Sequence, residues 1–178
     1  GAGAIALYGA SGDVGYRGNF SAREAGDVRT PNGTLFNSGL RERNMSGMIG
    51  VHRTWGTAAV DYSHVGQEIE IHEDPDEEPD ATPYQKIAHD RWHVHTNFPA
   101  DLGRLELHGG WQRNDRQEFE SAAASESVVH LKLTTLTLDV KAHHRPIGRF
   151  MGTAGISVMN QTNETLGEEE LIPNFDLS

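Results

Sequence analysis

The chain has 178 residues, of which 36% are hydrophobic and 7% aromatic, and its formal net charge is −11. This acidic balance argues against a nucleic-acid partner, because surfaces that bind nucleic acid are basic. The absence of cysteine excludes disulfides and thiolate metal sites, and no apolar run is long enough for a transmembrane helix. A hydrophobic fraction of 36% is low for the core of a soluble domain of this length.

Alternating apolar and polar residues predict eight β-strands along the chain. In chain order we expect them at about residues 3–9, 12–23, 44–54, 57–70, 88–98, 103–119, 128–144 and 149–163. The connections alternate between tight turns, at 9–12, 55–56, 99–102 and 145–148, and longer polar loops, at 24–43, 71–87 and 120–127. Short turns at one end and long loops at the other are typical of an outer-membrane barrel wall.

The predicted fold class is therefore all-β. We expect an antiparallel up-and-down meander of about eight strands that is part of a larger transmembrane β-barrel. The frequent glycines agree with this expectation, because glycine inside strands weakens a soluble sheet. A soluble antiparallel sheet with one wet face also alternates, however, so alternation alone does not separate the two folds.

The predicted strand 88–98 separates its two faces most clearly. Trp92, Val94 and Phe98 share one face, and the opposite face is polar. In a membrane barrel the apolar faces of successive strands would form one outer band, with Trp92, Val94, Leu105, Leu107, Leu138, Val140, Ile156 and Val158. In a soluble protein the same residues would instead meet a second sheet. Trp92 and Trp111, expected near strand ends, fit an aromatic girdle at a membrane interface.

Histidine is abundant, with ten residues, and several of them fall on the polar faces of the predicted strands. The expected lumen-facing ligand candidates are Arg91, His93, His95, His108 and His143. His93 and His95 stand two residues apart, so their imidazoles project to the same side and could share a metal ion.

The candidate metal ligands are His72, His89, His93 and His95. His72 opens an acidic loop at 72–80, and imidazole with carboxylate suits zinc or another divalent transition ion. A proline-containing acidic loop is more often simply solvated, and lumen histidines are often hydrogen-bonded wall residues. A transported iron chelate is therefore as good an expectation as transported zinc, and no resident cofactor is expected.

Catalytic motifs are missing from the sequence. It has no nucleophile elbow, no phosphate-binding glycine loop with lysine and no zinc-protease helix motif. We therefore do not expect an enzyme.

Several short segments resemble, in order, the early barrel strands and loops of TonB-dependent outer-membrane receptors. They are residues 12–18 (GDVGYRG), 26–33 (GDVRTPNG), 37–39 (NSG), 89–92 (HDRW), the end of the strand at 119–120 (FE), 144–152 (HRPIGRFMG) and 167–173 (GEEELIP). The resemblance covers nearly the whole chain, and the HRPIG turn looks most similar to the zinc- and metal-uptake subgroup.

This resemblance implies a bacterial outer-membrane receptor for energy-coupled uptake of a scarce nutrient, such as an iron chelate, cobalamin or a metal ion. Receptors of this family have a barrel of roughly 22 strands with a plug domain inside it. The implied partners are outer-membrane lipid, the plug domain, a periplasmic energy-coupling protein and the small nutrient. The sequence has neither a plug nor a coupling motif and lacks an aromatic C-terminal residue. Residues 1–178 are thus expected to be a partial barrel domain, without the plug or the C-terminal strands.

Two alternatives remain open from the sequence. One is a soluble all-β module whose acidic loop captures a cation. The other is a complete small outer-membrane barrel of eight strands with a structural or adhesive role, which requires the first strand to pair with the last.

Overall fold

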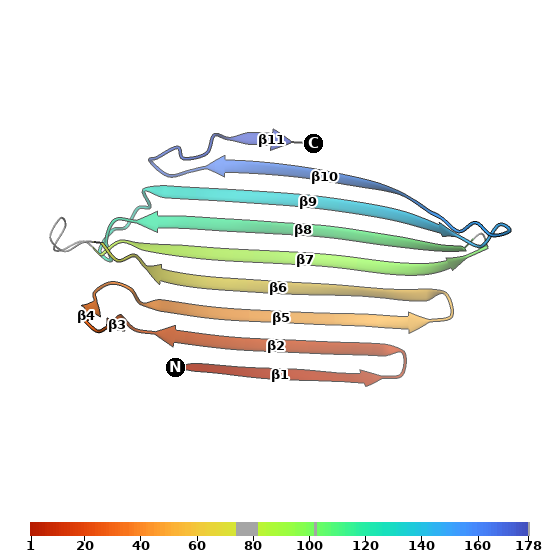
Figure 1. The fold of residues 1–178 in the computed structure, drawn as a ribbon, viewed down its shortest axis with the longest axis horizontal. Helices are drawn as coiled ribbons and strands as arrows, with labels where there is room; N and C mark the ends of the chain where they lie inside the picture. The colour runs from red at the N-terminus through yellow and green to blue at the C-terminus, as the bar shows by residue number, and fades with distance from the viewer. Residues whose placement is uncertain (74–81, 102, 178) are drawn as a thin grey trace.

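The computed structural model describes residues 1–73, 82–101 and 103–177 of the chain, and its main element is one antiparallel sheet (Figure 1). Neighbouring strands follow the order β1-β2-β5-β6-β7-β8-β9-β10-β11. Their bounds are β1 Ala2–Ser11, β2 Val14–Ala25, β5 Leu40–Arg53, β6 Gly56–Glu70, β7 Tyr84–Ala100, β8 Gly103–Phe119, β9 Val129–His144, β10 Thr153–Thr165 and β11 Phe175–Leu177. Two short strands, β3 Val28–Thr30 and β4 Gly33–Leu35, form a separate hairpin.

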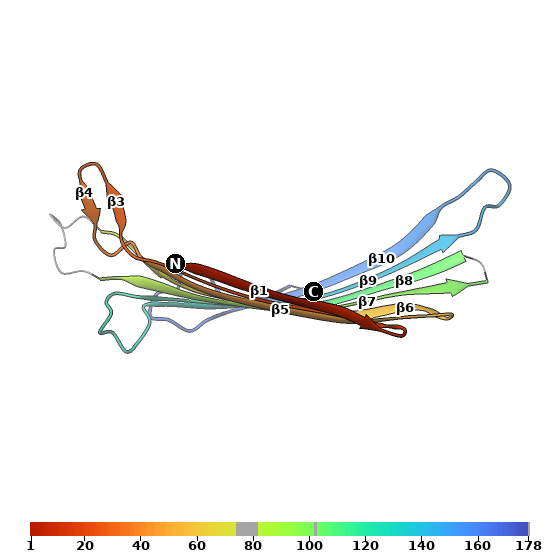
Figure 2. The same ribbon diagram turned by 90° about the horizontal axis from the view of Figure 1, so that it is seen from below.

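The sheet is a single curved layer with two open edges (Figure 2). Within the described ranges β1 pairs only with β2, and β11 pairs only with β10. The first and last strands therefore do not close a small eight-stranded barrel. None of the described residues forms a helix that could cross a membrane.

The eight predicted strands are all present, but several of their ends differ from the prediction. The prediction for 103–119 matches β8, whereas β5 and β7 each begin four residues earlier than expected, at Leu40 and Tyr84. These added ends are rich in charged and amide side chains that pair across the ladder, as in the hydrogen bond from Gln67 Nε2 to Glu42 Oε2 (2.7 Å). The short strands β3, β4 and β11 were not predicted, because three residues are too few to show a period.

The connection after β9 is longer than the sequence suggested. We expected a turn at 145–148 and a strand from 149, but β10 begins at Thr153. Pro146 has no backbone N–H to give to a ladder, and Ile147 and Phe150 instead form an isolated bridge. Three of the four connections at this end are therefore tight, and the fourth spans 145–152. The sorting of short and long connections is thus less strict than predicted.

Two of the tight turns depend on glycine. Gly56 has a φ of 132° and Gly103 a φ of 150°, which L side chains rarely adopt. A Cβ atom would also overlap backbone of the neighbouring strand, at the carbonyl of Asn97 for Gly56 and that of His143 for Gly103. Both hairpins therefore need glycine at the first residue after the turn.

The long connections meet at the opposite end of the sheet. Asn37, with a φ of 57°, donates from Nδ2 to the carbonyls of Ile71 (2.6 Å) and Pro83 (2.8 Å), so it ties the loop before β5 to the loop before β7. Close by, the rings of Tyr84 and Phe119 stack at 4.6 Å. Phe119 and Val129 are the only buried hydrophobic residues in the described part of the chain. The buried hydrophobic residues therefore lie at the end of the sheet that carries the long loops.

Candidate functional site

The two faces of the sheet differ sharply in chemistry. Cross-strand pairing aligns one central row of apolar-face residues across eight strands: Gly9, Tyr16, Ile49, Val60, Val94, Gly109, Leu138 and Val158. The next row toward the tight turns contains Val14, Val51, Ala58, Thr96, Leu107, Val140 and Ile156. The residues predicted to share one continuous apolar surface therefore do so. We call this surface the apolar band.

Aromatic residues border the apolar band at both ends. On the loop side Tyr62, Trp92 and Trp111 occupy one row, and the rings of Tyr62 and Trp92 are 4.7 Å apart. On the turn side the rings of Trp55 and Phe98 are 5.8 Å apart. The prediction that Trp92 and Trp111 lie near strand ends was wrong, because each of them lies in the middle of its strand, β7 or β8.

A charged network begins just beyond the loop-side aromatic row. Asp90 accepts a hydrogen bond from the Tyr62 hydroxyl (2.7 Å) and lies 2.8 Å from Nδ1 of His64. The guanidinium of Arg113 is 3.9 Å from the same carboxylate. The apolar band therefore ends abruptly in paired charges on the central strands.

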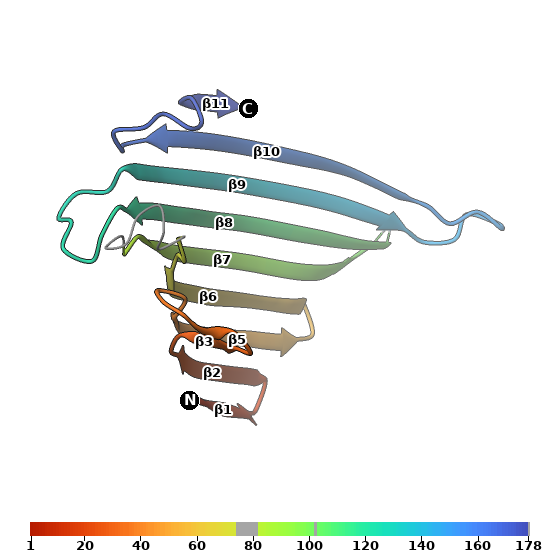
Figure 3. The ribbon, with the colours of Figure 1, turned by 60° about the vertical axis from the view of Figure 1, so that its left-hand side comes forward.

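The apolar band slants across the strands. Ile5, Phe20 and Met45 are apolar and in register on the first three strands, yet the same row continues into His64 and the charged residues of β7 and β8. Toward the other edge of the sheet the band shifts to the turn side, where β10 contributes Ala154, Ile156 and Val158. A slanted band is expected where strands tilt relative to the layer that their side chains face. Figure 3 shows the strands fanning across the sheet.

Nothing in the described part of the chain covers the apolar band. Val94 is 46% exposed, Val158 55% and Ile156 73%. The chain has 12275 Å² of accessible surface, whereas a compact monomer of 19.5 kDa has about 8500 Å². This excess of roughly 3700 Å² shows that the sheet is not packed as a compact globular domain.

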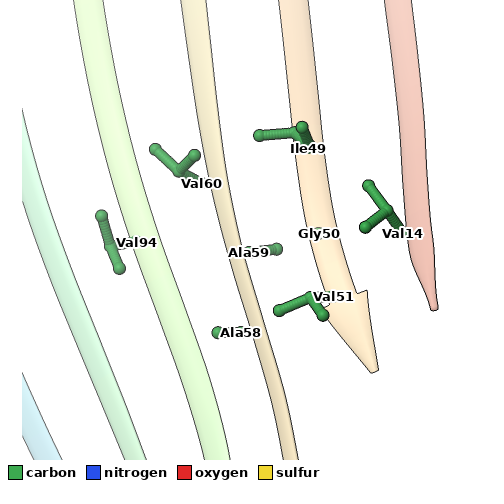
Figure 4. A pocket seen from close by; sticks show the side chains of 8 residues that line it. All are labelled: Val14, Ile49, Gly50, Val51, Ala58, Ala59, Val60 and Val94. Atoms are coloured by element: carbon green, nitrogen blue, oxygen red, sulfur yellow. The ribbon is translucent and has the colours of Figure 1, made fainter. Parts of the chain in front are cut away.

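The apolar band also carries a shallow hollow of about 360 Å³ over β2, β5, β6 and β7 (Figure 4). Its lining is apolar because small side chains alternate with valines: Val14, Ile49, Gly50, Val51, Ala58, Ala59, Val60 and Val94. Such a surface offers no polar partner to a ligand and suits only a hydrocarbon.

The polar face carries a cluster of imidazoles at its centre. Asp61 on β6 is in register with His93 on β7, and His95 is in register with His108 on β8. Nδ1 of His93 lies 3.2 Å from Oδ2 of Asp61. One ligand atom from each of Asp61, His93 and His95 lies within 4.8 Å of the others. The His108 ring is 5.7 Å from that of His93 and 6.2 Å from that of His95, between centroids.

The other predicted ligand candidates lie apart from this cluster. Arg91 is exposed on the polar face, in register with Ser63 and Gln112. His143 belongs to a separate group toward the turns, where it lies 3.3 Å from Glu106 and 2.8 Å from the Thr153 hydroxyl.

The predicted metal set of His72, His89, His93 and His95 needs correction, because the structure brings only the last two together. His89 is two rows away, beside Asn114 (3.4 Å). His72 lies in a loop with Nδ1 2.7 Å from the carbonyl of Phe36. Residues 74–80 of the predicted acidic loop lie outside the described residues.

Two cluster residues were missing from the predicted metal set, for different reasons. Only two residues separate β7 from β8, and so short a connection fixes hairpin register, which pairs His95 with His108. The pairing of Asp61 with His93 crosses the long 71–83 connection, which leaves the register free. Only the alternation of strand 57–70 indicated that Asp61 faces the polar side.

No protein-family model matches the chain, and no curated protein matches it. The function must therefore be argued from the apolar band and the polar face with its cluster.

Proposed function

We propose that the chain forms part of the wall of an outer-membrane β-barrel, with the apolar band toward lipid and the polar face toward the lumen. The observation that carries this proposal is the uncovered, slanted apolar band with aromatic borders. Lipid would cover the apolar band, which makes up part of the roughly 3700 Å² of excess surface, without a second protein layer. The hollow in the band would accept part of an acyl chain.

The height of the apolar band agrees with a membrane. From Val14 to Ala22 the apolar face of β2 runs for eight residues, or roughly 27 Å at about 3.4 Å per residue. Strands in barrels tilt by about 40°, which reduces this to a height of roughly 20 Å. Outer-membrane barrels have an apolar band about 25 Å tall between aromatic girdles.

On this proposal the open edges belong to a barrel with more strands than these. Unpaired backbone groups at β1 and β11 would cost several kcal/mol each in hydrocarbon, so membrane sheets close on themselves. Further strands would pair with both edges and enclose a lumen wide enough for the charged polar face.

The transport role is that of a TonB-dependent receptor, which the order of the sequence segments supports. On this proposal the receptor takes up a scarce nutrient by an energy-coupled process and is not an enzyme. Its partners are outer-membrane lipid, a plug domain, a periplasmic energy-coupling protein and a small nutrient that meets the polar face.

The imidazole cluster alone would also suit a soluble cation-binding module. Such a module would have to bury the apolar band under a second layer, and no described residue lies over it. The membrane-wall proposal accounts for both faces, whereas the soluble module accounts for one.

Epitope tags inserted into the intact gene product test this topology. A tag in the 120–128 connection, at the loop end, should bind antibody on intact cells. A matched tag in the 145–152 connection, at the turn end, should bind only after the outer membrane is permeabilised. Recovery of both tagged proteins in the soluble fraction would contradict the proposal. For the transport role, deletion of the gene should slow growth under zinc or iron-chelate limitation, and equal growth under both would count against uptake.

A further inference from the structure

We propose that Asp61, His93 and His95 form a binding site for a divalent transition-metal ion of the zinc class, with His108 as the fourth donor. The inferred role of this site in uptake rests on the proposed function, whereas metal binding itself rests only on the geometry of the sheet. The inference assigns a substrate class, a divalent transition ion, to the polar face.

The strand geometry positions these donors before any metal binds. Residues two apart on β7 point the same way, and the neighbouring strands β6 and β8 add one donor each at the adjoining register positions. Around a tetrahedral ion with bonds of about 2.0–2.1 Å, donor atoms lie roughly 3.4 Å apart. The 3.2 Å separation between Asp61 and His93 already matches this value. Donor atoms up to 4.8 Å apart would close in by a side-chain rotation.

Two of the rings have free nitrogens for this task. In the described part of the chain neither His95 nor His108 makes a side-chain hydrogen bond. Their rings lie 5.7 to 6.2 Å from one another and from that of His93, between centroids. By contrast, His72 and His143 already engage a carbonyl or a hydroxyl. His95 and His108 can therefore ligate an ion without giving up another hydrogen bond.

The donor types select the ion. Imidazole suits zinc, copper, nickel and iron, whereas magnesium and calcium prefer an all-oxygen set. A carboxylate with three imidazoles falls within the range of known zinc sites. Asp139, in register with His108, adds a further negative charge beside the cluster.

Partial exposure makes the site reversible. The side chains of His93 and Asp61 are 24% and 29% exposed, so an ion could arrive and leave through the polar face. Closed structural zinc sites bury their ions within four fixed ligands. We therefore expect an exchangeable ion, as a cargo would be.

Calorimetric titration with zinc chloride tests the site on the intact protein in detergent micelles. Wild type should bind one ion in this cluster, and His93→Ala and His95→Ala should each lower the affinity at least about tenfold. His89→Ala is the matched control, since it removes an imidazole from the same strand and face two rows away, and it should leave the affinity unchanged. Cobalt(II) should give the intense visible absorption of a four-coordinate ion, which His108→Ala should weaken.

Two results would overturn the metal site. One is a wild-type protein that binds no zinc, and the other is an equal loss of affinity in His89→Ala and His93→Ala. Circular dichroism of each variant separates misfolding from ligand loss. If zinc binds but the epitope tags place the protein outside the outer membrane, the proposed function fails and the metal site stands. If the topology holds without zinc binding, only the metal site fails.

Discussion

Val158 and Met159 are adjacent residues on β10 that point to opposite faces of the sheet and are equally exposed, at 55% and 54%. Replacing each with arginine therefore compares the two faces at one position along the strand. Val158 lies in the central row of the apolar band, in register with Leu138. If the band faces hydrocarbon, Val158→Arg should lower the free energy of unfolding by about 2–4 kcal/mol, the cost of arginine near a bilayer midplane. That is roughly a 30- to 700-fold change in the folding equilibrium constant.

Met159→Arg faces the polar side, beside Thr137, and should change the unfolding free energy by less than about 1 kcal/mol. The assay is guanidinium unfolding of the protein in phospholipid vesicles, followed by tryptophan fluorescence. In a soluble sheet with both faces in water, each substitution would cost less than about 0.5 kcal/mol. Equal small effects of the two arginines would therefore refute the reasoning about the apolar band.

Three further predictions follow from individual residues. Gly56→Ala should lower the free energy of unfolding by more than about 2 kcal/mol because of its backbone conformation. The control Gly15→Ala adds a Cβ that meets no atom within 4 Å and should change this free energy by less than about 0.5 kcal/mol. Chemical denaturation measures both, and equal losses would contradict the need for glycine in the turn. Asp90→Ala should cost about 1–3 kcal/mol by leaving its half-buried partners Tyr62 and His64 unpaired. Asp13→Ala, which breaks an exposed ion pair with Arg53 (2.8 Å), should cost less than about 1 kcal/mol, and equal losses in the same unfolding assay would contradict a stabilising role of the network. A chelator such as EDTA should remove zinc from the cluster, because the side chains of His93 and Asp61 are partly exposed, and zinc that stays bound during dialysis against the chelator would contradict an exchangeable site.

The strands were predictable from the sequence because a half-exposed strand must alternate. The alternation of β8, from Leu105 through Trp111, has no competing period, and its predicted bounds match the structure. In the predicted strand 44–54 the faces were blurred by Met48, which is apolar but lies on the polar face, in register with Arg17 and Asp61. A flexible apolar side chain can occupy either face, so periodicity alone could not assign it.

Registers across long connections were not predictable. The 71–83 connection gives no geometric link between β6 and β7, and a slip by one residue would move Asp61 to the other face. Only hydrogen bonding along the whole ladder fixes Asp61 opposite His93. For this reason the sequence predicted only the imidazole pair of His93 and His95. The carboxylate of Asp61 joins this group through the register of the sheet.

The central claim is that one face of this sheet meets lipid and the other meets water, and nitroxide accessibility along β9 tests it most directly. The chain has no cysteine, so a cysteine introduced singly at each of residues 136–141 would be the one labelled position of that variant. In the native membrane, collisions with oxygen should peak at Leu136, Leu138 and Val140, and collisions with a water-soluble nickel chelate should peak at the residues between them. High nickel accessibility at all six positions, or no period of two, would contradict the account.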